Sequence, residues 1–247
     1  PPWKASSLAF MANKKNKVNF LCSACGDDFP KWNGQCPSCK EWGTLSEFKV
    51  LGKKKNTKTE YRDYRPLNDI LETEPGKRLT TGIIEADRVL GGGLLPGSLL
   101  LLGGNPGVGK STLALHICSD INKPVLYVSA EESEEQIAIR AKRINVESKN
   151  LHLSSENDLN GILTHIDRIS PALVIIDSIQ TILNPDLDSL PGSPSQIRDC
   201  GQKFLEVSKQ KNVIIIIIGH VTKEGTIAGP KMLEHMVDTV LYLEGDD

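Results

Sequence analysis

A glycine-rich segment with a single lysine is the part of this sequence best suited to bind phosphate. Residues 104–111 match the pattern G-x-x-x-x-G-K-[ST] at every fixed position. Glycines let main-chain N–H groups converge on a phosphate, and the start of a following helix adds partial positive charge. We expect Lys110 to bridge β- and γ-phosphates and the Ser111 hydroxyl to bind Mg²⁺. The residues expected to line this nucleotide site are Gly104, Asn105, Pro106, Gly107, Val108, Gly109, Lys110, Ser111 and Thr112.

Four of the six cysteines form two C-x-x-C pairs separated by ten residues. Four thiolates in a tetrahedron suit Zn²⁺ in a structural site, so we expect a zinc ribbon. About 30 residues bury too little apolar surface to fold alone, so the metal should supply most of the folding free energy. Phe29, Trp32 and Trp42 are expected to form its apolar cover. A redox dithiol, a pair of disulfides and an iron–sulfur cluster are the alternatives. The expected zinc ligands are Cys22, Cys25, Cys36 and Cys39.

Two apolar segments end in carboxylates that suit phosphoryl chemistry. Residues 173–176 have the pattern of a buried strand and precede Asp177, which we expect to hold Mg²⁺ through water. Residues 124–129 precede Glu131 and Glu132, and a carboxylate at this position can orient an attacking water. The alternative is that both glutamates only favour the N-terminus of the helix expected over residues 134–143.

The elements that must position these groups alternate between strand and helix. Leu99–Leu102 reads as a buried strand that leads into the phosphate loop, and an amphipathic helix follows from Ser111. Residues 213–218 are six β-branched residues in succession, which predicts a central strand buried on both faces. Open α/β sheets place ligands at the carboxyl ends of their strands. We therefore expect an α/β fold with a mostly parallel central sheet flanked by helices.

Composition excludes several classes of protein. The chain has 247 residues, a net charge of −2 and 24% charged residues, so it lacks a global basic signature for nucleic acid. Its longest apolar run, residues 213–218, is far shorter than the roughly 20 residues that a membrane helix needs. Residues 1–10 do not resemble a secretion signal. We expect a cytoplasmic protein with no membrane partner.

A longer motif connects the phosphate loop to a known family. Residues 81–99 read T-G-x-x-x-x-D-x-x-L-G-G-G-x-x-P-G-S-L and run straight into the loop. This arrangement resembles the RecA-type ATPases, and with the four-cysteine ribbon it is similar to the RadA (Sms) family of bacterial DNA repair proteins. The likeness covers about residues 18–246 and continues through residues 127–133, 173–181, 219–225, 227–230 and 233–242.

The resemblance implies a RecA-like P-loop NTPase fold and assigns roles to individual residues. It points to Glu131 as the carboxylate that acts on water, with Glu132 as the fallback, and to His220 as a sensor of the γ-phosphate. Lys223 and Lys231 are expected to lie in a loop that binds DNA. A structural histidine and a solvated turn are the alternatives for these last assignments. The residues expected to take part in catalysis are Lys110, Glu131, Asp177 and His220.

A second loop is expected near DNA as well. In the RecA-type resemblance, residues 184–196 hold the position of the first DNA-facing loop, and they are rich in Pro, Ser, Gly and Asp. Asp186, Asp188 and Asp199 lie in or beside it and argue against tight contact with phosphate. An exposed loop without a DNA role is therefore an equal alternative.

The resemblance further implies a function. It predicts a DNA-dependent, helicase-like ATP hydrolase that binds single-stranded or branched DNA and promotes branch migration in repair. The full-length protein is expected to form a homo-oligomeric ring, with a recombinase or replicative helicase as a partner. ATP is favoured over GTP because Gly225 replaces the carboxylate that would read guanine. The alternatives are an ATP-switched scaffold whose ribbon recruits a partner protein, and a small-molecule kinase, for which no acceptor site is evident.

The same features divide the chain into segments. Residues 1–17 are expected to be a disordered extension, residues 18–48 the zinc ribbon and residues 49–65 a basic linker. The linker is either a flexible tether or a contact for a phosphate backbone. Residues 66–247 are expected to form the RecA-like ATPase domain, truncated before the C-terminal segments that the resemblance implies.

Overall fold

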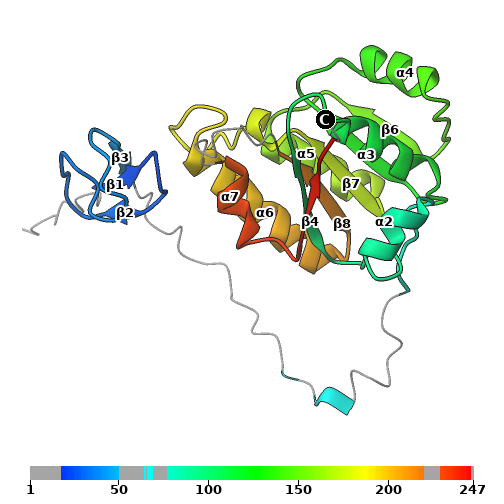
Figure 1. Ribbon diagram of the computed structural model, residues 1–247, viewed down its shortest axis with the longest axis horizontal. Coiled ribbons are helices and arrows are strands. Elements are labelled where there is room, and N and C mark those ends of the chain that lie inside the picture. Colours follow the sequence, from blue (N-terminus) through cyan, green and yellow to red (C-terminus); the bar gives the residue numbers. More distant parts are fainter. Residues whose placement is uncertain (1–17, 50–63, 65, 69–76, 220–228, 246–247) are drawn as a thin grey trace, which may run out of the picture. The chain divides into compact units, whose positions relative to one another are not determined.

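The computed structural model describes residues 18–49, 64, 66–68, 77–219 and 229–245 (Figure 1). The chain forms two compact units. The smaller contains β1 (Val18–Cys22), β2 (Asp28–Phe29) and β3 (Leu45–Lys49). The larger contains the helices and strands from α2 (Ile84–Val89) onward.

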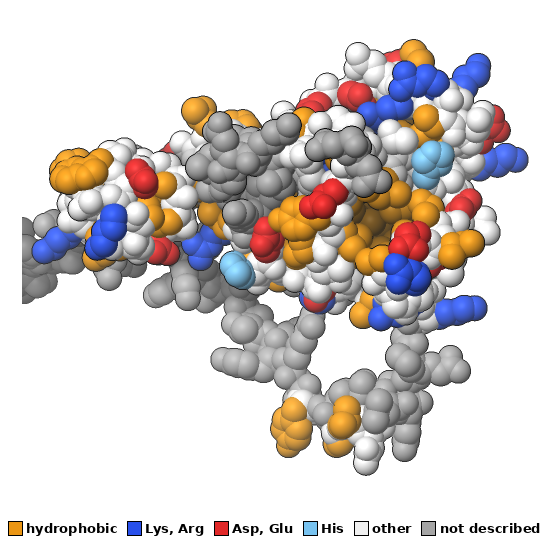
Figure 2. All heavy atoms as spheres, viewed as in Figure 1, with side chains coloured by type: hydrophobic (Ala, Val, Ile, Leu, Met, Phe, Trp, Pro, Cys, Tyr) orange, Lys and Arg blue, Asp and Glu red, His pale blue; other side chains and the backbone are white. Residues whose placement is uncertain are grey.

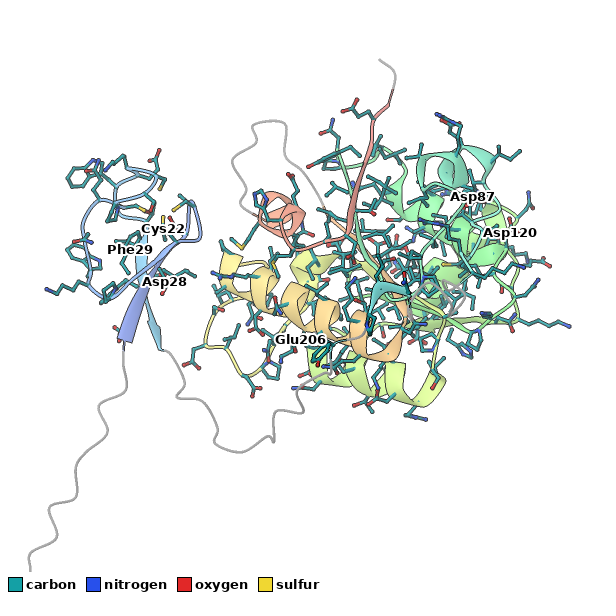
Figure 3. All side chains as sticks on the ribbon, turned by 90° about the horizontal axis from the view of Figure 1, so that it is seen from below. Cys22, Asp28, Phe29, Asp87, Asp120 and Glu206 are labelled. Atoms are coloured by element: carbon teal, nitrogen blue, oxygen red, sulfur yellow. The ribbon has the colours of Figure 1, made fainter. Side chains whose placement is uncertain are left out.

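The small unit is a three-stranded antiparallel sheet whose core contains cysteines and a few apolar side chains. Its strand order is β2-β1-β3, with Phe20 opposite Phe29 and Cys22 opposite Leu45. Cys22, Cys36 and Leu45 are buried, and Phe20 and Phe29 pack against them. Figure 3 shows Phe29 close to Cys22.

The prediction that two tryptophans cover this core was wrong. Trp32 is 61% exposed and Trp42 is 74% exposed, whereas Phe29 packs inward as expected. The cysteines and a few apolar side chains fill the interior of so small a unit, so the indole rings remain outside. Figure 2 shows apolar side chains gathered on the surface of this unit.

The large unit is built on a six-stranded parallel sheet, which confirms the predicted mostly parallel architecture (Figure 1). The strand order is β6-β5-β7-β8-β4-β9, and neighbouring strands pair in parallel throughout. The strands are β4 (Leu99–Gly104), β5 (Val125–Ser129), β6 (Leu151–Ser154), β7 (Leu173–Asp177), β8 (Ile214–Ile218) and β9 (Thr239–Leu243).

Helices cover both faces of this sheet. The helices after α2 are α3 (Lys110–Ser119), α4 (Glu134–Arg143), α5 (Leu159–Ile169), α6 (Pro194–Lys211) and α7 (Gly229–Glu234), with a 3₁₀ turn, η1 (Ile179–Thr181). Apolar residues of α3 and α4 pack with one face of the strands, and those of α5 and α6 pack with the other. Among the described residues, none of the helices combines the length and apolar character needed to cross a bilayer.

Burial on both faces explains the continuous apolar strands. Leu100 and Leu102 of β4 belong to the cluster with α3, and Leu99 and Leu101 belong to the cluster with α6. All five residues of β8 are buried, as predicted from the β-branched run. A central parallel strand has no polar face because a helix layer lies on each side.

The glycine-rich segment before β4 has a structural explanation in this fold. The backbone N–H and the side-chain hydroxyl of Thr81, which is fully buried, both donate to Asp87 Oδ1 at 2.8 Å. Gly93 has a φ of +117°, and a Cβ there would come 2.6 Å from the carbonyl oxygen of Leu79. The T-G-x-x-x-x-D and G-G-G parts of the motif therefore stabilise the chain's entry into β4.

Candidate nucleotide site and metal site

The predicted phosphate loop connects the carboxyl end of β4 to the start of α3. Gly107 and Gly109 have φ values of +81° and +102°, which favour glycine. A Cβ at either position would meet no described atom within 4 Å, so the space in front of the loop is open. Gly104 differs, because a Cβ there would lie 2.4 Å from the carbonyl oxygen of Leu243. The backbone at Gly104 is therefore closely packed, whereas the space beside Gly107 and Gly109 is open and can admit phosphate.

Lys110 is the first residue of α3 and is only 4% exposed. Its Nζ donates to the carbonyl oxygens of Gly104 and Asn105, both at 2.9 Å. Burial lowers the pKa of this ammonium group, and the nearby charges of Asp177 and Glu131 oppose that shift. Ser111 and Thr112 follow in the first turn and are half-buried.

The predicted carboxylates come together at the ends of β5 and β7. Asp177 is the last residue of β7, is 6% exposed, and lies opposite Ser129 of β5. The Ser178 hydroxyl donates to Glu131 Oε1 at 2.7 Å, which places Glu131 beside Asp177. Two predicted site residues that are far apart in the sequence are therefore neighbours in space.

Glu132 lies in a different environment from Glu131. Arg140 of α4 donates to Glu132 Oε1 at 3.0 Å and lies 2.8 Å from Oε2. Ser133 is the N-cap of α4 and forms a capping box with Gln136, so both glutamates precede the helix. Glu131 thus has a contact outside α4, with Ser178, whereas Glu132 contacts α4 itself through Arg140. That both glutamates favour the helix N-terminus stays an alternative.

Tyr127 is a site residue that sequence reasoning missed. It is fully buried in β5, and its hydroxyl donates to Asp177 Oδ2 at 2.5 Å. Burial raises the pKa of Tyr127, and the negative charge of Asp177 and the hydrogen bond to it raise the pKa further, so the hydroxyl stays protonated. The only signal in the sequence was a tyrosine among the aliphatic residues of the predicted strand, which ends in Ser129.

Some predicted residues cannot be placed. His220 and Lys223 lie outside the described residues. Lys231 belongs to the backbone of α7, but its side chain is outside the described part of the chain. Their predicted roles stay predictions.

Hydrogen bonds join the first and last residues of segment 184–196. Asn184 N donates to the fully buried Gln196 Oε1 at 2.8 Å, and Gln196 Nε2 donates to the carbonyl oxygens of Asn184 and Ser189 at 3.1 and 3.0 Å. Helix α6 begins at Pro194, so the segment ends earlier than expected. Its exposed part therefore lies between two anchored ends.

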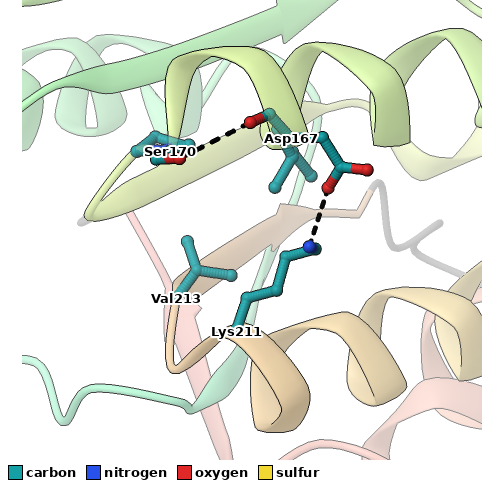
Figure 4. Close-up of a pocket in the computed structure, with 6 residues that line it drawn as sticks. Asp167, Ser170, Lys211 and Val213 are labelled. Carbon is teal, nitrogen blue, oxygen red and sulfur yellow. Dashed lines mark hydrogen bonds and ion pairs between the residues drawn. The ribbon is translucent and has the colours of Figure 1, made fainter.

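A hollow of about 340 Å³ at the other end of the sheet is separate from the phosphate loop (Figure 4). It lies next to Pro171 and Val213, which precede β7 and β8. Asp167 and Lys211 form an ion pair across it at 2.8 Å. Both side chains are about half exposed, so this pair should contribute less than about 1 kcal/mol to the stability of the α5–α6 contact.

The four predicted zinc ligands converge on one point. The Sγ atoms of Cys22, Cys25, Cys36 and Cys39 all lie within 4.8 Å of one another. Cys22 Sγ and Cys39 Sγ are 3.6 Å apart. Sulfurs of a tetrahedral zinc site with Zn–S bonds of about 2.3 Å lie about 3.8 Å apart, so the arrangement fits Zn²⁺.

The two cysteine turns share one backbone geometry. Cys22 N donates to the carbonyl oxygen of Asp27, and Cys36 N donates to that of Glu41, both at 2.9 Å. The residue after the second cysteine has a positive φ in each turn, at +80° for Gly26 and +64° for Lys40. Lys40 thus occupies a position that favours glycine.

Replacing Lys40 with glycine should therefore stabilise the ribbon. A non-glycine residue in the left-handed region costs on the order of 1–2 kcal/mol. We expect Lys40→Gly to raise resistance to zinc removal by a chelator relative to Lys40→Ala, which removes the side chain but keeps the Cβ. Equal resistance in the two variants would show that the backbone at Lys40 is not strained.

Comparison with known proteins assigns the large unit to a family. A family model described as an AAA domain matches residues 72–226, which is more than half of the chain. The chain belongs to the AAA domain family. Residues 20–47, which precede the AAA domain, match a model described as a rubredoxin metal binding domain, in agreement with the zinc ribbon.

The resemblance to RadA is also confirmed. DNA repair protein RadA of Listeria monocytogenes is 46% identical over 96% of this AAA domain chain, and that of Bacillus subtilis is 43% identical over 94%. The chain spans about half of these relatives, 53% of each.

A solved structure supports the RecA-like architecture of the AAA domain. A KaiC-like protein of Pyrococcus horikoshii superposes with a TM-score of 0.55 at 20% identity, covering 68% of this chain and 82% of that one. At this identity the likeness concerns the fold alone.

Proposed function

We propose that the AAA domain binds and hydrolyses ATP with Mg²⁺ and couples hydrolysis to single-stranded or branched DNA in repair. The observation that carries the ATP part is Lys110, buried at the start of α3 with its ammonium group held at the base of an open glycine loop. The repair part rests on the RadA relatives. A homo-oligomeric ring of the full-length protein, with a recombinase or replicative helicase as partner, belongs to the same proposal.

Each residue at the site has a task in this proposal. The loop N–H groups and Lys110 bind the phosphates and stabilise the charge that develops on the γ-phosphate. The Ser111 hydroxyl and the Asp177 carboxylate hold Mg²⁺, which would neutralise phosphate charge when bound. The oxygen donors of these residues are of the kind that Mg²⁺ prefers.

Glu131 is the better candidate to orient the attacking water. It is exposed and lies beside Asp177 through Ser178, whereas Glu132 is bound by Arg140. The Arg140 guanidinium group engages the oxygens of Glu132, so they are less available to contact a water than the solvent-exposed carboxylate of Glu131. We therefore assign water activation to Glu131 and a supporting contact to Glu132.

DNA contact has to be local, since the net charge of the chain is −2. Lys223 and Lys231 are the proposed contacts, and His220 is the proposed link between the γ-phosphate and their loop.

DNA-dependent ATP turnover tests the proposal. We expect the full-length protein to hydrolyse ATP faster with single-stranded DNA than without it, and we expect the stimulation to fall as salt rises. Replacing Lys223 and Lys231 with Ala should remove the stimulation and leave basal turnover unchanged. Salt-insensitive stimulation, or stimulation that survives both substitutions, would contradict the assigned DNA contacts.

One observation favours a second function, an ATP-switched scaffold. Trp32 and Trp42 of the ribbon are largely exposed, and exposed tryptophans often anchor protein partners. ATP binding without any DNA stimulation of turnover would favour this alternative.

A further inference from the structure

A chain of hydrogen bonds runs from the proposed Mg²⁺ carboxylate to helix α4. The Tyr127 hydroxyl donates to Asp177 Oδ2 at 2.5 Å and accepts from Arg140 Nη2 at 3.3 Å. Arg140 Nη1 in turn donates to Glu132 at 3.0 Å. Three elements, β7, β5 and α4, are thereby connected through side chains that lie side by side.

These hydrogen bonds, together with one from Ser178, form a closed ring at the loop that follows β5. Ser178, which is next to Asp177, donates to Glu131 Oε1 at 2.7 Å, and Glu131 is next to Glu132. The loop that carries both glutamates is therefore held at two points. One is the Ser178 hydroxyl and the other is the Arg140 guanidinium group.

Apolar side chains would pack equally well at the position of this ring. Tyr127 is fully buried in the cluster that holds Ile137 and Ile175, and a phenylalanine would fill nearly the same volume. The Arg140 side chain is only 17% exposed. Burying polar groups costs free energy unless they are well paired, and Arg140 Nε lacks a hydrogen-bond partner among the described residues, so this cost is only partly offset. The groups that do pair converge on the proposed site.

We propose that Tyr127 and Arg140 are positioning residues that hold Asp177 and the Glu131–Glu132 loop at a fixed separation. The Tyr127 hydroxyl sets the orientation of the Asp177 carboxylate. Arg140 fixes Glu132 and, through the main chain, the position of Glu131. A fixed separation aligns the attacking water with the metal-bound phosphate, and small misplacements are costly in such reactions. This inference rests on the proposed ATP hydrolysis.

Tyr127→Phe tests the first contact because it removes a single oxygen. A hydrogen bond to a charged group is worth about a tenfold change or more in an equilibrium or rate. We expect kcat for ATP hydrolysis by the full-length protein to fall about tenfold while KM for ATP changes less than about twofold. Tyr242→Phe is the matched control, since the Tyr242 hydroxyl donates to Glu234 on the surface. That variant should keep the wild-type kcat.

Metal affinity gives a readout that is independent of turnover. Electron paramagnetic resonance measures the affinity of Mn²⁺ for the protein in the presence of a non-hydrolysable ATP analogue. This affinity should fall severalfold in Tyr127→Phe and stay unchanged in Tyr242→Phe.

The ring also predicts that substitutions at Tyr127 and Glu132 have coupled effects on kcat. Glu132→Gln and Tyr127→Phe combined should lower kcat by less than the product of their separate effects, because both break the same ring.

The outcomes distinguish a failure of the proposed function from a failure of the positioning role. A wild-type protein that does not hydrolyse ATP overturns the proposed function and the positioning role together. Robust wild-type turnover with an unchanged kcat in Tyr127→Phe overturns the positioning role alone. Parallel losses of kcat, ATP affinity and melting temperature in Tyr127→Phe would show a merely structural tyrosine and would also overturn the inference.

Discussion

Replacing Lys110 with alanine should lower the rate of ATP hydrolysis by at least about a hundredfold. Lys110 supplies an ammonium group at the base of the phosphate loop, and losing one preorganised donor to transition-state charge commonly costs two to three orders of magnitude. Steady-state turnover of purified wild-type and Lys110→Ala protein measures the effect. Folding should persist, because the substitution also removes a buried charge whose pKa is lowered by burial.

Lys123→Ala is the matched control for this substitution. Lys123 is exposed in the connection between α3 and β5, so its loss changes the net charge by the same amount away from the loop. The control should retain wild-type turnover and both variants should retain the wild-type melting temperature. Wild-type turnover in Lys110→Ala would end the assignment of the loop as the catalytic site.

Changing Cys36 to serine should remove zinc from the small unit. Cys36 is fully buried and belongs to the cluster of four Sγ atoms. A serine hydroxyl is a poor zinc ligand, and structural zinc contributes folding free energy directly, so we expect zinc affinity to fall more than about a hundredfold. Elemental analysis should find about one zinc per chain in the wild type and close to none in the variant, with faster proteolysis of residues 18–49.

Ser38→Ala is the control within the same turn. Ser38 is exposed between Cys36 and Cys39, so its loss should leave zinc content and protease resistance unchanged. The large unit has its own core, and its melting transition should be the same in both variants. Full zinc content in Cys36→Ser would contradict the four-thiolate site, and iron in the wild type would favour the cluster alternative.

The sequence was sufficient to predict the elements whose burial is extreme. Strands β4, β7 and β8 read as unbroken apolar runs because helices pack on both of their faces. Helix α4 was predicted over residues 134–143, as observed, and the structure shows that Ser133 and Gln136 form a capping box at its start. Strand β6 lies at the edge of the sheet and exposes His152, and its short, half-polar sequence gave too little periodicity to be recognised.

Local motifs identified Lys110 and Asp177, because glycine spacing and a strand-final carboxylate are visible within a few residues. The Tyr127–Asp177 bond could not be predicted, since those residues are 50 positions apart and meet only because β5 and β7 are neighbours. The same limit applies to Arg140, whose partners depend on how α4 packs. The orientation of the two tryptophans was mispredicted because cysteines, Leu45 and two phenylalanines fill the ribbon core and leave no room for the indole rings.

Calorimetric titration of a non-hydrolysable ATP analogue with Mg²⁺ into the purified protein tests the central claim most directly. The claim is that the glycine loop and Lys110 together bind a nucleoside triphosphate. It predicts saturable heat with one site per chain for the wild type and loss of that heat in Lys110→Ala. No binding heat from the wild type, or equal affinity in the two proteins, would contradict the account.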